Sequence, residues 1–163
     1  MSATEMLRQI STLQAQLGEW KELHHILHDV LAAFSPFYAS LRALSHGQAG
    51  AMDGRALLQG WRSCQAEVDR LTDFESSTEY VRLASRREGT TPSWPDWGAR
   101  IAALRREVEE RLREETWDTE GLLDLADEFH HVCDCYLSLA DRELRRVIEE
   151  TQGLYVRLPG GLG

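Results

Sequence analysis

The chain has 163 residues, 42% hydrophobic and 28% charged, so it can bury a substantial core and lacks the composition of a disordered protein. Its net charge of -9 opposes binding to a phosphate backbone, and we expect no nucleic-acid partner. No apolar run approaches the ~20 residues that cross a bilayer, and the N-terminus lacks the layout of a signal peptide. We therefore expect a cytoplasmic protein without a membrane partner.

The most regular apolar pattern lies in residues 19–44. Its members are spaced three or four positions apart, as on one face of an α-helix: Trp20, Leu23, Leu27, Val30, Phe34, Phe37, Leu41 and Leu44. Residues 4–17 carry a similar stripe, and Gly18 between the two is compatible with one continuous or gently bent helix. Pro36 lacks a backbone amide, so we expect a kink there.

A second amphipathic segment follows a glycine-rich connection over residues 46–52. Asp53 is a candidate N-cap for this segment, whose apolar stripe runs from Leu57 to Leu71. Ser76 and Glu79 have the spacing of a capping box, which suggests that a helix restarts there. The sequence leaves open whether residues 54–88 form one helix or two.

The clearest break in the chain is residues 89–95, which contain one glycine and two prolines. Ser93 and Asp96 have capping-box spacing before a third helical stripe over residues 97–112. We expect Asp118 or Thr119 to cap a fourth helix, from residue 120 to about 150, and Gly153 to end its pattern. These segments predict an all-α, up-and-down bundle of four to five long amphipathic helices over residues 1–157, with a linker-like tail over 158–163.

Histidines cluster in the first and last predicted helices, as HHILHD at 24–29 and HHVCDC at 130–135. At 100° per residue, His24, His28 and His130 lie on the flanks of their apolar stripes. A metal site would therefore have to lie at the seam between these two helices, with Asp134 as a fourth ligand. The alternative is that the histidines cover the edge of the core and keep one nitrogen in water. The second and third helices contain no histidine, which disfavours a di-metal centre.

The three cysteines, Cys64, Cys133 and Cys135, lack the spacing of a disulfide framework, and we expect reduced thiols. Cys64 and Cys133 fall on buried stripes. Cys135 follows His131 by one helical turn, but two surface residues do not make a catalytic centre. Because no catalytic or nucleotide-binding motif is present, we predict no catalytic residue and no cofactor.

Three residues predicted to face outward are candidates for contacts with a partner. They are Trp94 in the 89–95 break and His25 and His131 on the helices. Tryptophan often anchors protein interfaces, although Trp94 is also suited to hold its loop onto the bundle.

Residues 17–38, LGEWKELHHILHDVLAAFSPFY, resemble the small helical adaptors of bacterial conflict systems. These are the effector-associated domains and the related caspase- and TPR-associated helical modules, and the shared pattern is L-G-x-W-K-E-L-H-x-x-L-H-D followed by F-x-P-F. The resemblance implies a module without catalytic residues. Such a module would couple a sensor NTPase or a TPR protein to an effector, such as a protease, in antiviral defence.

The leading hypothesis is therefore a non-enzymatic adaptor that binds a protein partner through a helical face. The competing hypothesis is a metal-binding bundle that uses the histidine seam. A third is a subunit that forms a homo-oligomer through spare apolar surface.

Overall fold

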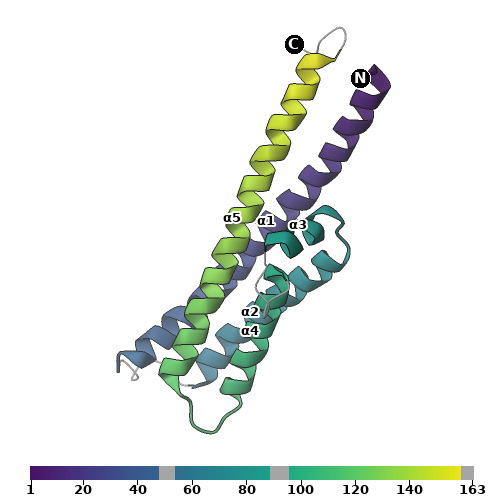
Figure 1. Cartoon of the computed structure of the whole chain (residues 1–163). Helices are drawn as coiled ribbons and strands as arrows, with labels where there is room; N and C mark the ends of the chain where they lie inside the picture. The colour runs from purple at the N-terminus through teal and green to yellow at the C-terminus, as the bar shows by residue number, and fades with distance from the viewer. Residues whose placement is uncertain (48–53, 89–95, 159–163) are drawn as a thin grey trace.

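The computed structural model describes residues 1–47, 54–88 and 96–158, and these contain five α-helices and no strand. The helices are α1 (Ala3–Ser45), α2 (Gly54–Ser76), α3 (Tyr80–Glu88), α4 (Trp97–Leu112) and α5 (Thr119–Arg157). The predicted all-α, up-and-down bundle is thereby confirmed (Figure 1). No helix in the described ranges combines the length and apolar character needed to span a membrane.

The two long helices, α1 and α5, lie antiparallel and bring both ends of the chain to the same end of the molecule (Figure 1). At 1.5 Å per residue, the 43 residues of α1 and the 39 of α5 span ~64 and ~58 Å. Because α2 has 23 residues and α4 has 16, these helices reach only ~34 and ~24 Å. They complete a four-helix bundle along one part of the α1/α5 pair and leave the end that carries both termini as a two-helix projection.

The core of the four-helix part is built around aromatic rings from three helices. Phe34 lies 4.8 Å from Phe129 between ring centroids, and Trp61 packs 5.0 Å from Phe37 and 5.9 Å from Phe129. These side chains are at most 2% exposed. The stripe predicted for residues 19–44 supplies this core, because its regular spacing keeps every large apolar side chain on one face.

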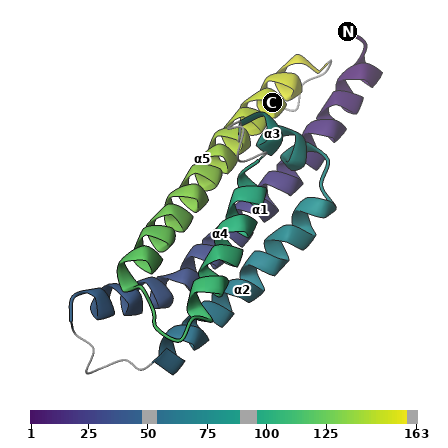
Figure 2. The same cartoon turned by 60° about the horizontal axis from the view of Figure 1, so that its bottom comes forward.

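The helix α1 continues through both Gly18 and Pro36. Figure 1 and Figure 2 both show the C-terminal part of α1 running in a different direction from its N-terminal part, which agrees with the kink expected at Pro36. The carbonyl of Pro36 accepts a hydrogen bond from Ser40 Oγ at 2.8 Å, one turn further along the helix.

Residues 54–88 form two helices, and the capping box predicted from Ser76 and Glu79 is wrong. Ser76 Oγ instead donates to the carbonyl of Asp73 in the last turn of α2. The first turn of α3 is capped by Glu19 of α1, whose Oε1 accepts hydrogen bonds from the amides of Glu79, Tyr80 and Val81 at 3.1–3.2 Å. This carboxylate satisfies amides that a short helix leaves open and holds α3 beside α1 (Figure 2).

Two other helix ends differ from the prediction. Asp96 is itself the N-cap of α4 and accepts from the Ala99 amide at 2.6 Å, while Ser93 lies outside the described residues. Asp118 caps α5 as expected. However, α5 does not end near residue 150 and continues through Gly153 to Arg157, because Leu154 is buried against the N-terminal part of α1.

Replacing Phe34 with alanine is expected to lower the free energy of unfolding by about 3–5 kcal/mol, because it opens a cavity between α1 and α5. Leu7→Ala on the same helix is the matched control, since Leu7 is 56% exposed and should change stability by less than about 0.5 kcal/mol. Urea unfolding of both variants measures the difference. Equal losses would contradict the placement of the core.

Candidate interaction surface

The candidate metal ligands of the first and last long helices lie in two separate groups. His24 Nε2 lies 2.7 Å from Asp141 Oδ1 on α5, and its ring centroid is 4.5 Å from that of His28. His130 Nδ1 lies 3.3 Å from Asp134 Oδ2, and the His130 ring stacks beside Tyr38 at 6.1 Å.

The structure does not bring together His24, His28, His130 and Asp134, the ligands of the alternative metal-binding hypothesis. In the described part of the chain, no group of three or more His, Cys, Asp or Glu side chains is arranged to hold a metal ion. His24 binds a carboxylate that was not part of the set, and His130 covers aromatic rings. This arrangement matches the alternative of histidines at the edge of the core.

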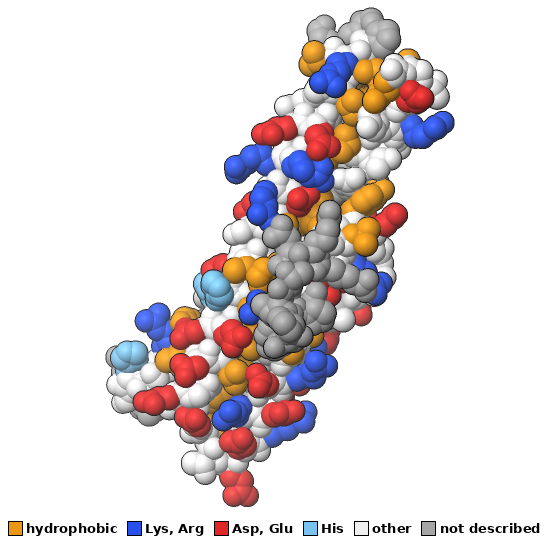
Figure 3. All heavy atoms as spheres, in the orientation of Figure 1, with side chains coloured by type: hydrophobic (Ala, Val, Ile, Leu, Met, Phe, Trp, Pro, Cys, Tyr) orange, Lys and Arg blue, Asp and Glu red, His pale blue; other side chains and the backbone are white. Residues whose placement is uncertain are grey.

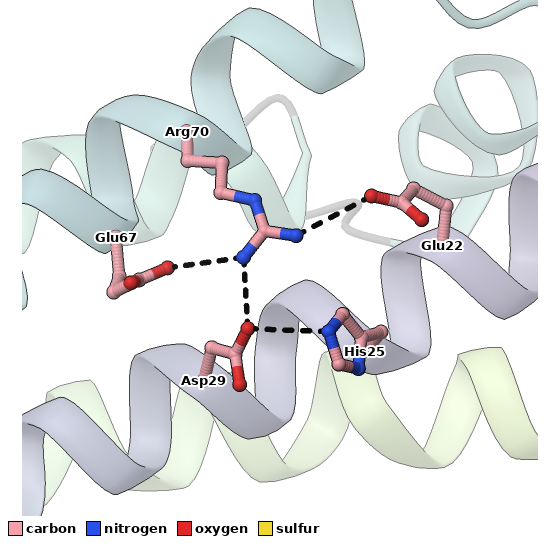
Figure 4. A network of polar contacts seen from close by, with 5 residues as sticks. All are labelled: Glu22, His25, Asp29, Glu67 and Arg70. Carbon is pink, nitrogen blue, oxygen red and sulfur yellow. Dashed lines mark hydrogen bonds and ion pairs between the residues drawn. The ribbon is translucent and has the colours of Figure 1, made fainter.

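The predicted contact residue His25 lies beside a surface network centred on Arg70 of α2 (Figure 4). Arg70 Nη1 donates to Asp29 Oδ2 at 2.8 Å, and His25 Nε2 lies 3.5 Å from the same oxygen. Glu22 and Glu67 each approach the guanidinium at 3.4 Å. Hydrogen bonding to Asp29 is the main cause that raises the pKa of Arg70. The network joins α1 to α2, but its members are exposed enough for water and salt to weaken it.

The other two residues predicted to contact a partner are His131 and Trp94. His131 is exposed, and its Nε2 lies 3.6 Å from the Sγ of Cys135. Trp94 lies outside the described residues.

The cysteines are free thiols. Cys64 and Cys133 are buried, and this burial raises the pKa of Cys64 to about 12 and that of Cys133 well above its usual value. Both thiols therefore stay protonated at neutral pH and are poor nucleophiles.

A carboxyl group that the sequence analysis did not single out lies between three helices. Glu75, at the end of α2, accepts a hydrogen bond from Tyr136 Oη of α5 at 2.7 Å. A Cβ atom at Gly98, in the first turn of α4, would lie 2.1 Å from Glu75 Oε1, so this glycine provides the room for the carboxyl. Burial is the largest cause that raises the pKa of Glu75 to about 7, and the charge of Asp96 acts in the same direction.

An open groove with an apolar floor runs along the seam of the two-helix projection. It has a volume of about 610 Å³ and lies at the end of the molecule that carries both termini. Its floor contains Leu13 and Leu154, which are 5% and 8% exposed. Figure 3 shows hydrophobic side chains gathered along this seam. Gln16 lines both this groove and a smaller hollow beside α3, so the groove continues the surface on which α3 packs.

The two walls of the groove, here called the α1 wall and the α5 wall, differ in charge. The side chains of the α1 wall are uncharged and belong to Met1, Gln9, Thr12 and Gln16. The α5 wall contains Gly153 with Glu149 four residues before it and Arg157 four residues after it. Within the described residues neither of these two charged side chains makes an ion pair with another side chain.

Sequence reasoning missed this groove because it assigned Gly153 to the end of a helix. Two signals pointed to it. The stripe of residues 4–17 has uncharged polar neighbours on one side, and the apolar spacing continues from Val147 to Leu154.

Comparisons with protein-family models, curated proteins and solved structures found no match to this chain. The class of protein is thus given by the structure alone, in which the described residues form an all-α helical bundle.

The raised pKa of Glu75 predicts a pH-dependent stability. In the folded state the carboxyl stays neutral up to about pH 7, whereas in the unfolded chain it ionises above pH 4.5. The folded state is therefore more stable at low pH, where the carboxyl is neutral in both states. This contribution should be lost as the pH rises from about 4.5 to about 7, and the loss should be roughly 3 kcal/mol. Glu75→Gln keeps an acceptor for Tyr136 without titrating, so subtracting its unfolding free energy from that of the wild type at each pH isolates the effect.

Gly98→Ala provides an independent check. The added methyl group displaces the Glu75 carboxyl towards water, so its pKa should fall towards 4.5 and the same pH dependence should weaken. If the unfolding free energy of Glu75→Gln fell with rising pH as steeply as that of the wild type, the assignment of this pH dependence to Glu75 would be wrong.

Proposed function

We propose that this chain is a non-catalytic module for protein–protein interaction and that it binds its partner in the α1/α5 groove. The observation that carries the proposal is an open groove with an apolar floor on a projection that the other described helices do not cover. A long groove between two helices suits an amphipathic helix, which would place its apolar face on Leu13 and Leu154.

The class of partner is a further part of the proposal. The resemblance of residues 17–38 to conflict-system adaptors supports a role between a sensor, such as an NTPase or TPR protein, and an effector such as a protease. The apolar residues of this segment, including Trp20, Leu23 and Leu27, are core residues. The segment therefore supports the scaffold, and the groove residues lie outside it. This division is compatible with a common scaffold that presents a variable contact surface.

The histidines considered as metal ligands make other contacts in the described residues. His24 contacts the Asp141 carboxylate and the ring of His28, and the His130 ring stacks beside that of Tyr38.

A library of amphipathic helical peptides, selected on the wild-type protein, tests the groove. Binders should lose at least about tenfold in affinity for Gly153→Trp, because the indole fills the groove. The matched control is Gly18→Trp on the exposed face of α1, since neither glycine has another atom within 4 Å of a Cβ placed on it. Fluorescence anisotropy gives both dissociation constants. Binders that tolerate Gly153→Trp as well as they tolerate Gly18→Trp would contradict the proposed site.

A further inference from the structure

We infer that the occupant of the groove is a second copy of this chain, so that two projections pack groove to groove as a two-fold symmetric four-helix assembly. This inference rests on the proposed function, because it assigns a particular partner to the same surface. It is carried by the arrangement of charge on the α5 wall and by the local neutrality of the groove.

The charges on the α5 wall of one copy are complementary to those on the same wall of a second copy related by a two-fold axis. Glu149, Gly153 and Arg157 are spaced by four residues, so they lie on one face of α5. When two α5 helices cross antiparallel at Gly153, Glu149 of each copy lies at the level of Arg157 of the other. A two-fold axis through the crossing point therefore forms two ion pairs from residues that make none within one described chain.

Gly153 is suited to the crossing point. Nothing lies within 4 Å of a Cβ placed on it, so no contact within the described chain requires a glycine there. A glycine inside a helix lowers stability by about 1 kcal/mol relative to alanine. Its lack of a side chain allows another backbone to approach closely, which is what the two-fold crossing requires.

The charge of the whole molecule favours a copy of itself over a strongly charged partner at this surface. The chain has a net charge of -9, so two copies repel each other unless the surfaces in contact are locally neutral. The side chains of the α1 wall are uncharged. On the α5 wall, Glu149 and Arg157 balance each other, and Arg146 Nη1 donates to Glu150 Oε1 at 2.9 Å. A basic or acidic partner would find no complementary field here.

The test uses two charge reversals and their combination, measured by sedimentation velocity over a range of concentrations. Glu149→Arg and Arg157→Glu should each weaken the wild-type dimer about tenfold, because each substitution places like charges together at two symmetric positions. The double variant should recover to within about threefold of wild type. An equimolar mixture of the two single variants should form a heterodimer more tightly than either variant alone, since both ion pairs then have opposite charges.

Glu107→Arg and Arg106→Glu, exposed on α4, are the matched controls because they change the net charge equally outside the groove. They should leave the dimer unchanged, alone and mixed. Dimerisation that responds equally to these controls would overturn the inference, since the interface would then lie elsewhere or depend on net charge alone.

A wild-type protein that stays monomeric up to ~1 mM would also overturn it. In that case peptide binding that is lost in Gly153→Trp would still support the proposed function with a different partner. Failure of both experiments would remove the groove as an interaction surface.

Discussion

The antiparallel packing of α1 on α5 is the constraint on which the rest of the structure depends. The apolar stripe of α1 starts at Met6 and continues to Leu41, and α5 accompanies it along nearly this whole length. A helix of this kind is stable only where its apolar face is covered. Since α2 and α4 are too short to cover the whole pair, the projection buries only the direct α1/α5 contact. The groove is the geometric result of this difference in helix length.

The contact between Glu19 and α3 fixes where the four-helix part gives way to the projection. With nine residues, α3 is too short to be stable as an isolated helix. The Glu19 carboxylate binds three amides at its N-terminus, and Val81 buries itself against the core. These contacts anchor α3 at the inner end of the groove. Leu83 of α3 remains 55% exposed there, so the apolar surface does not stop where the groove ends.

Sequence periodicity predicted the core well, because residues such as Phe34 and Trp61 must repeat with the helix to share one face. It predicted helix ends less well, because contacts distant in sequence override local signals. Burial of Leu154 offsets the helix penalty of Gly153, and the cap of α3 comes from a carboxylate 60 residues away. The contacts of the histidines could not be predicted for a related reason. Helical phase gives the side of a helix, but only the register between α1 and α5 places Asp141 beside His24.

Glu75 connects the chemistry of the core with the position of α3. An apolar side chain would fill this space without the desolvation cost of a carboxyl, so its presence makes the stability of the bundle depend on pH. Glu75 lies five residues before Tyr80, the first residue of α3, and it also contacts α4 at Gly98 and α5 at Tyr136. Ionisation near neutral pH therefore places a poorly solvated charge where α2, α4 and α5 meet. The backbone carbonyl of Glu75 also accepts the Thr78 amide, so the residue that carries this charge is joined directly to the turn that leads to α3.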